Sequence, residues 1–180
     1  MVVGDTGKEV AVDIGGGQGE YFVDRARGEP QKTFVILEPA PLSLPDKPPN
    51  LHIIRWKSTA ALTLPFADKS IDEVNINYLF GKMEPSRLER HRPLDQKEIY
   101  RRLIKDARQV LKSGGKISII DAHCHINLIK EILIESGYHI VQEPISLPDP
   151  DRTYWSGKFT EDYERNEESF VAPMIIEAQK

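Results

Sequence analysis

Four glycines within five residues follow directly on the first apolar run of the chain. The run, Glu9–Ile14 (EVAVDI), is too short for a helix and predicts a buried strand. The glycines occupy positions 15, 16, 17 and 19, and apolar side chains then recur at helical spacing through residues 20–27, up to Gly28. In such a strand, turn and helix, main-chain amides approach a polar or anionic ligand with no side chain between them. The sequence therefore predicts a ligand site at this turn.

Short apolar runs continue to alternate with helical patterns along the rest of the chain. Helices are expected over residues 96–111 and 127–136, and further strands at Thr33–Glu38, Leu51–Arg55, Ile71–Asn77, Lys116–Asp121, Tyr138–Glu143 and Ser169–Ala178. This alternation favours an α/β fold with a parallel sheet and right-handed crossovers. Five prolines within residues 39–50 leave no room for a long helix after the second strand, so we expect an abbreviated fold there. Pro173, which cannot donate a ladder hydrogen bond, is expected at an exposed sheet edge or a bulge.

Length and composition describe one domain, spanning residues 1–180. Hydrophobic residues make up 39% of the chain, and 24 basic residues against 28 acidic ones give a net charge of −4. Cys124 is the single cysteine, so no intramolecular disulfide forms, which fits a cytoplasmic location. No stretch approaches the roughly 18 apolar residues of a membrane span, and the first residues lack the pattern of a signal peptide. We therefore expect neither membrane insertion nor secretion.

The spacing around the turn favours a nucleoside over a dinucleotide. A dinucleotide fingerprint starting at Gly15 needs glycine at its sixth position, where this chain has Glu20. Glu38 stands 21 residues after Gly17, at the end of the second strand, where a carboxylate accepts hydrogen bonds from ribose hydroxyls. The alternative is that the glycines only make a tight turn and that Glu38 is a solvated strand end.

The acidic residue followed by GxGxG resembles the first motif of the class I S-adenosylmethionine-dependent methyltransferases. The segments LPFADKSIDEV (64–74) and VLKSGGKISII (110–120) extend this resemblance over most of the chain. It implies a Rossmann-like fold, with a mostly parallel seven-stranded sheet whose last strand is antiparallel, and S-adenosyl-L-methionine as cofactor. The residues that match the family's donor-binding positions are Asp13, Gly15, Gly17, Gly19 and Glu38.

The resemblance also assigns a role to each of these residues. Asp13 would lie near the aminoacyl end of the donor, the glycines under its sulfonium and ribose, and Glu38 on the ribose. The family often has an acidic residue near the adenine, just after the third strand. This chain has Ser58 and Thr59 there, and we expect a hydroxyl to substitute.

Methyl transfer from a sulfonium is an in-line displacement, which needs alignment of donor and acceptor and no nucleophilic side chain. The acceptor should bind beyond the carboxyl ends of the strands, around residues 77–80. Asn77 and Tyr78 are the candidate catalytic residues, because the amide can orient an acceptor and the ring can stack on a base. A plain core or loop role is the alternative for Tyr78 and Phe80.

Residues 82–112 include ten basic and five acidic residues, so this segment carries +5 and the remainder of the chain −9. A basic stretch beginning at the acceptor pocket suggests an RNA substrate. The alternative is a solvated helix face with ion pairs between residues four apart.

The layout further resembles the tRNA (guanine-N7)-methyltransferase branch of the family. By that resemblance Arg90, His91 and Arg92 belong to its basic stretch, and Thr160 and Glu164 would contact the guanine. Trp155 lies in a long acidic loop, which is expected to cover the site or to anchor on the core. The chain departs from the branch at Phe80–Glu84 (FGKME), which replaces a DPWPK signature and removes its aspartate.

Other functions and ligands remain open at this point. A small-molecule methyltransferase and a non-catalytic S-adenosylmethionine-binding partner subunit are the alternatives to an RNA methyltransferase. Asp121, His123 and His125 alternate along the sequence as metal ligands on a strand would, but they are interpreted as polar residues at the pocket rim, and no metal is expected. The sequence does not indicate an oligomeric state.

Overall fold

The computed structural model describes residues 7–15, 19–38, 42–56, 63–77, 96–146 and 173–180. The strands within these ranges are β1 (Val10–Ile14), β2 (Thr33–Glu38), β3 (Leu51–Arg55), β4 (Ile71–Asn77), β5 (Leu111–Ala122), β6 (His139–Ser146) and β7 (Pro173–Gln179). The helices are α1 (Glu20–Gly28), α3 (Gln96–Val110) and α4 (His123–Glu135).

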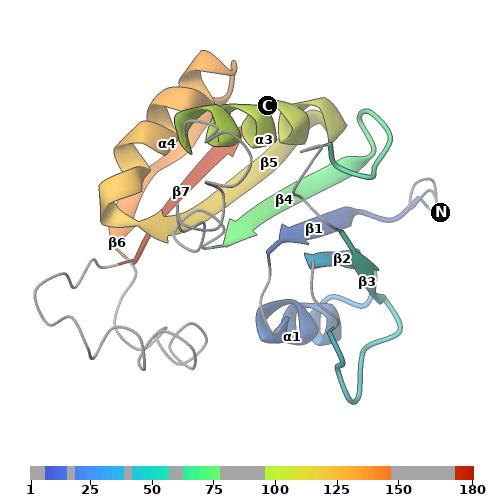
Figure 1. Ribbon diagram of the computed structural model, residues 1–180. Coiled ribbons are helices and arrows are strands. Elements are labelled where there is room, and N and C mark those ends of the chain that lie inside the picture. Colours follow the sequence, from blue (N-terminus) through green and yellow to red (C-terminus); the bar gives the residue numbers. More distant parts are fainter. Residues whose placement is uncertain (1–6, 16–18, 39–41, 57–62, 78–95, 147–172) are drawn as a thin grey trace, which may run out of the picture.

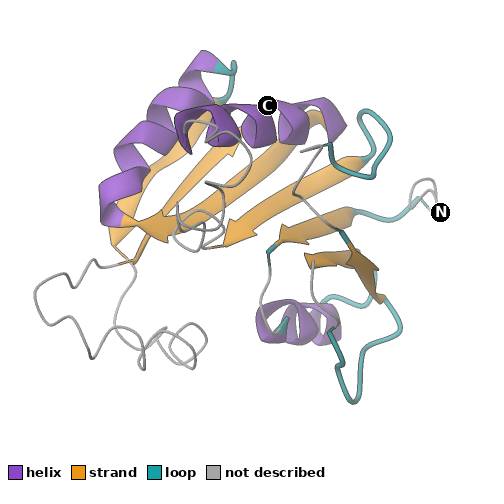
Figure 2. Ribbon diagram, viewed as in Figure 1, coloured by secondary structure: helices purple, strands orange, loops and turns teal. Residues whose placement is uncertain are grey.

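All seven strands form one sheet, in the order β3-β2-β1-β4-β5-β7-β6. The first five pair in parallel, and β7 runs antiparallel to β5 and to β6. Helices α3 and α4 cover one face of the sheet, and α1 lies against the other (Figures 1 and 2). The predicted fold class is therefore confirmed, and residues 42–50, after β2, contain turns and no helix.

Two apolar clusters lie on opposite sides of the sheet because β1, β2 and β4 send alternate side chains to each face. The larger one joins the sheet to the apolar face of α3, formed by Tyr100, Leu103, Ile104 and Ala107. The smaller one packs Phe22 and Ala26 of α1 on Ala11, Phe34, Ile36 and Leu51. Burial of each large side chain contributes roughly 1.5–3 kcal/mol, so the two clusters fix where the strand ends lie.

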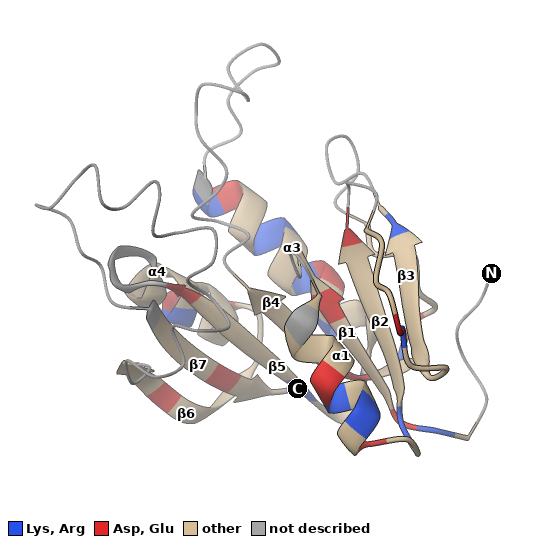
Figure 3. Ribbon diagram, turned by 90° about the horizontal axis from the view of Figure 1, so that it is seen from below, with Lys and Arg blue, Asp and Glu red and all other residues tan. Residues whose placement is uncertain are grey.

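One half of the sheet lacks a helix on the α1 side among the residues described. Figure 3, seen from below, shows α1 in front of the sheet near β1 and no described helix in front of β6 and β7. Strand register places Asn77, Ile120, Ile175 and Ile145 in one row across this face. The row begins at the carboxyl end of β4 and becomes more exposed toward β6, where Ile145 is 50% exposed.

Three sequence-based expectations are wrong in detail. The strand that begins at Pro173 is not an edge strand, since β7 pairs on both sides; Pro173 is tolerated because it is the first residue of the strand. Strand β5 begins at Leu111, ahead of the expected Lys116, and passes through Gly114 at φ +77°. Helix α4 begins at His123, so His123 and His125 do not alternate with Asp121 along a strand.

The glycine turn brings α1 close to β2. Gly15 (φ +77°) donates from its amide to the carbonyl of Leu37, at an N···O distance of 3.0 Å. Gly19 (φ +75°) is the N-cap of α1, and Val23 donates to its carbonyl. A Cβ on Gly19 would lie 2.8 Å from Ile36 Cδ1 and 3.2 Å from Leu42 Cδ2. This position therefore requires glycine both for its backbone conformation and for the closeness of β2.

Gly19→Ala should destabilise the protein by about 2–4 kcal/mol, because left-handed strain adds to a clash with the buried Ile36 side chain. Gly7→Ala is the matched control, since Gly7 has φ +69° and a Cβ added there would meet no atom within 4 Å. The control should lose only about 1–2 kcal/mol. Urea denaturation of both variants checks the difference, and equal losses would show that the approach to β2 is not tight.

Candidate active site

The carboxyl ends of β1, β2 and β4 meet at one edge of the sheet because the three strands are parallel. Asp13 stands opposite Ile36 of β2 and Asn75 of β4. Glu38 and Asn77 each lie two residues further along their strands, so they project on the same face as Asp13. The structure thus brings three predicted site residues together beside the glycine turn.

Asp13 and Asn77 form a buried hydrogen bond across the sheet. Asn77 Nδ2 donates to Asp13 Oδ1 at 2.9 Å, and the two residues are 1% and 5% exposed. The sequence predicts that this amide orients an acceptor, and its observed partner is the carboxyl group of Asp13. A buried carboxyl that accepts one such bond keeps its position and orientation.

The pKa of the Asp13 carboxyl lies close to neutral pH. Burial raises the pKa of Asp13 from its ordinary value of 3.8 to about 7. The Asn77 hydrogen bond lowers this pKa, Glu38 raises it, Arg25 lowers it and Glu73 raises it. At neutral pH the carboxyl is thus close to half protonated, and a cationic group bound beside it would favour the ionised form.

Glu38 is the last residue of β2 and lies at the border of the candidate site. It is partly exposed at the end of β2, where the Trp56 amide donates to its carbonyl at 3.1 Å. Its charge raises the pKa of the Asp13 carboxyl, and strand register places both side chains on the same face of the sheet. The role of Glu38 as a ribose-binding carboxylate stays a prediction.

The other predicted site residues lie outside the described part of the chain. They are Gly17, Ser58, Thr59, Tyr78, Arg90, His91, Arg92, Trp155, Thr160 and Glu164.

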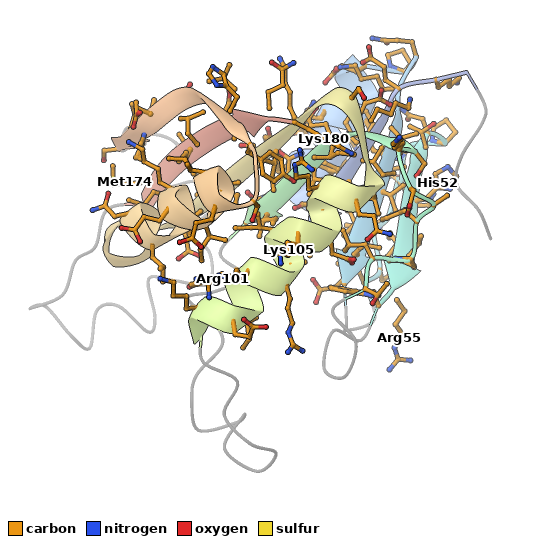
Figure 4. The ribbon with its side chains drawn as sticks, turned by 90° about the horizontal axis from the view of Figure 1, so that it is seen from above. His52, Arg55, Arg101, Lys105, Met174 and Lys180 are labelled. Carbon is orange, nitrogen blue, oxygen red and sulfur yellow. The ribbon has the colours of Figure 1, made fainter. Side chains whose placement is uncertain are left out.

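The part of the basic segment that is described forms ion pairs along α3 and just after it. Arg102 pairs with Glu98 at 2.8 Å, Arg101 with Glu135 at 3.1 Å, and Lys112 with Asp72 at 2.8 Å. Figure 4 shows Arg101 and Lys105 along α3. Only the Arg102–Glu98 pair joins residues four apart on one helix, as the alternative interpretation expects. The other two pairs join α3 to α4 and β5 to β4, and largely exposed pairs of this kind contribute little to stability.

Sequence reasoning missed an ion pair beside Asp13. Arg25 of α1 forms two hydrogen bonds with Glu73 of β4, and Asn75 also donates to Glu73. The available signal is that Glu73, Asn75 and Asn77 are polar at alternate positions of a strand, with apolar residues at the positions between them. Because alternate residues of a strand project on the same face, this pattern indicates that one face of β4 is polar and does not belong to the apolar core.

Neither a metal centre nor a membrane span is found in the ranges that the structure describes. They contain no group of three or more His, Cys, Asp or Glu side chains that could hold a metal ion. None of their helices is long and apolar enough to cross a bilayer.

Comparison with known proteins gives one curated relative. The chain is 29% identical over 112 residues to a tRNA (guanine-N(7)-)-methyltransferase of Limosilactobacillus fermentum (strain NBRC 3956 / LMG 18251). The match covers 58% of this chain and 49% of that protein, so the chain spans about half the length of its relative. No protein-family profile matches the chain.

Solved structures show the same architecture over nearly the whole chain. The [4+2]-cyclase SpnF superposes with a TM-score of 0.66 over 97% of this chain and 75% of its own, at 13% identity. The 16S rRNA methyltransferase KamB superposes with a TM-score of 0.64 over 96% of this chain and 87% of its own, also at 13% identity.

The chain has the class I methyltransferase fold. This agrees with the resemblance carried by the glycine motif, and it places the Asp13–Asn77 pair at the carboxyl edge where ligands bind in open α/β sheets. Because SpnF is a cyclase, the methyltransferase fold alone does not determine the reaction.

Asp13→Asn should stabilise the free protein at pH 8 while weakening binding of a cationic ligand. The folded-state pKa of Asp13, about 7, lies above its ordinary value of 3.8. Between these two pKa values the folded protein retains a proton that the unfolded chain releases. The contribution of Asp13 to stability therefore falls as the pH rises from about 4 to about 7. Asparagine does not ionise, so the substitution should recover roughly 2–4 kcal/mol at pH 8 and little at pH 4.

Urea denaturation between pH 4 and pH 8 measures this effect. Asp24→Asn is the matched control, since its side chain is 54% exposed on α1, and it should leave the pH dependence unchanged. A stability difference between Asp13→Asn and wild type that does not grow from pH 4 to pH 8 would contradict the burial argument.

Proposed function

We propose that this chain binds S-adenosyl-L-methionine at the carboxyl edge of β1, β2 and β4 and transfers its methyl group to a nitrogen of an RNA base. The observation that carries the proposal is the buried Asp13 carboxyl, held by Asn77 beside the glycine turn. A ligand that places a cation there gains a charge-assisted interaction, worth roughly 1.5–3 kcal/mol.

The residues of the site match the parts of such a donor. Asp13 would hold the cationic aminoacyl end, and Glu38 would accept hydrogen bonds from the ribose hydroxyls. Gly15 would keep the main chain free of a side chain beneath the ligand, Gly19 lets the start of α1 approach β2, and the N-terminus of α1 would offer amide groups to the ligand. When bound, the donor supplies an activated methyl group, and the chain's residues supply alignment.

Asn77 has two roles in this proposal. Its Nδ2 fixes the Asp13 carboxyl, and its carbonyl oxygen is the atom with which it would orient an acceptor at the end of β4. Tyr78 follows directly in the sequence and is proposed to stack on the acceptor base.

An RNA acceptor is supported by the character of the similar proteins and by charge. The curated relative is a tRNA methyltransferase, and KamB is an rRNA methyltransferase. Residues 82–112 are basic overall, and Arg90 and Arg92 are proposed to contact phosphates. Guanine N7 is the atom we favour, because its lone pair attacks without loss of a proton and needs no general base.

A non-catalytic donor-binding subunit is the second candidate. The replacement of DPWPK by Phe80–Glu84 favours it, since it removes an aspartate of the tRNA (guanine-N7)-methyltransferase branch. Such a subunit would bind donor and product through Asp13 and Glu38 without turnover.

Incubation with methyl-labelled S-adenosyl-L-methionine and bulk tRNA should label the tRNA. Asp13→Ala should weaken the binding of S-adenosylhomocysteine about tenfold or more, measured by calorimetry.

The double variant Arg90→Glu/Arg92→Glu should raise KM for tRNA about tenfold or more through lost phosphate contacts. Arg101→Glu/Arg102→Glu is the matched control, with the same change of charge on α3, and should alter KM little.

The outcomes separate the candidates. Product binding without labelling of tRNA, peptides or small-molecule extracts would favour the subunit. Labelling confined to small molecules would contradict the RNA acceptor. Tighter binding of NADH than of S-adenosylhomocysteine would overturn the donor assignment.

A further inference from the structure

An ion pair beneath α1 ties that helix to β4. Arg25 donates through Nη1 to Glu73 Oε1 at 2.5 Å and through Nη2 to Glu73 Oε2 at 3.0 Å. The two side chains are only 20% and 25% exposed. The guanidinium carbon lies 5.7, 5.6 and 5.3 Å from the ring centres of Tyr21, Phe22 and Phe34. These rings limit access of water, so the charges act on their surroundings more strongly than surface charges do.

Glu73 of this ion pair lies two residues before the residue of β4 that stands opposite Asp13. On β1 and β4, Ala11 stands opposite Glu73 and Asp13 opposite Asn75. Asn75 Nδ2 donates to Glu73 Oε1 at 2.8 Å. Glu73, Asn75 and Asn77 therefore form a continuous polar row on the face that Asp13 shares with α1.

Among the described residues, charged or polar groups from β4, β2 and α1 act on the Asp13 carboxyl. Asn77 and Glu73 come from β4, Glu38 from β2, and Arg25 and Tyr21 from α1. Arg25 favours the ionised carboxyl, whereas Glu38 and Glu73 disfavour it. Because Glu73 sits at bidentate distance from Arg25, their opposite effects on Asp13 largely offset each other.

We propose that the Arg25–Glu73 pair is a positioning unit of the donor site. Its two opposite charges balance each other and thereby set the electrostatic potential at the Asp13 carboxyl, and with it the pH range in which donor binds, where either charge alone would shift that range. Neither side chain needs to touch the donor, since the pair acts through Asp13 and through the placement of α1. This inference rests on the proposed function, because it assigns the ligand-binding role to ionised Asp13.

A merely structural ion pair makes a different prediction. If Arg25 and Glu73 only hold α1 on the sheet, removal of either partner loosens the same contact. Both variants then change donor affinity in the same direction and by a similar factor at every pH. If the pair sets the potential at Asp13, the two variants move the pH dependence of binding in opposite directions. Glu73→Gln leaves an uncompensated cation near Asp13, and Arg25→Gln leaves an uncompensated anion.

Calorimetric titration with S-adenosylhomocysteine at about pH 6 and about pH 8.5 distinguishes these cases, because Asp13 is largely ionised only at the higher pH. For each variant we take the dissociation constant at about pH 6 divided by the dissociation constant at about pH 8.5. This ratio cancels any general loss of affinity, and the ligand's own amino group titrates alike in all variants. We expect this ratio to fall roughly threefold in Glu73→Gln and to rise roughly threefold in Arg25→Gln.

Control variants separate charge from packing. The double variant Arg25→Gln/Glu73→Gln should return the ratio close to the wild-type value, and so should Arg25→Lys, which keeps the charge. Glu135→Gln removes an acid from the remote Arg101–Glu135 pair and should change nothing. Shifts in the same direction for both single variants, or no shift in either, would overturn the proposal.

A second readout does not require any ligand. The carboxyl carbon of Asp13, followed by NMR in the free protein, should titrate at lower pH in Glu73→Gln and at higher pH in Arg25→Gln. If wild type binds no S-adenosylhomocysteine at any pH, the proposed function fails while this titration still tests the ion pair. If binding occurs but the titration midpoints do not separate, only the positioning role fails.

Discussion

Parallel pairing of β1 with both β2 and β4 is the constraint on which the site depends. It brings Asp13, Glu38 and Asn77 to one edge of the sheet, where the other residues of β1 and β2 are buried and mostly apolar. An isolated carboxylate placed in such surroundings is costly, and it responds by holding its proton more tightly. The single amide of Asn77 reduces that cost without abolishing it. The free site therefore holds a carboxyl group that gains stability when a cation arrives.

Local features of the site are predictable from the sequence, and cross-strand features are not. The glycine turn and Glu38 follow from the order and spacing of residues along a strand-turn-helix-strand unit, which is set by short-range geometry. The Asp13–Asn77 bond joins residues 64 positions apart, and no local pattern specifies it. The Arg25–Glu73 pair escapes sequence reasoning for the same reason. The insertion of β7 between β5 and β6 also depends on sheet topology, which is why the sequence alone predicts Pro173 at an edge.

The fold and the chemistry are separate questions for this chain. SpnF and KamB share its architecture at 13% identity, although one is a cyclase and the other a methyltransferase. Function therefore depends on what the carboxyl edge presents to a ligand. Here that edge presents a carboxyl group whose pKa is about 7 and a second acid at the end of β2.

The position of β7 has a consequence for how the chain acquires its structure during synthesis. Strand β6 is the outer strand at one end of the sheet, and β7 is its neighbour among the strands that the structure describes. The ribosome makes residues 139–146 well before residues 173–179, so β6 has no strand to pair with until the later segment emerges. The half of the sheet around β1, β2 and β4 has no such dependence. The edge that carries Asp13, Glu38 and Asn77 is therefore expected to assemble first, and the sheet to be completed only when β7 enters between β5 and β6.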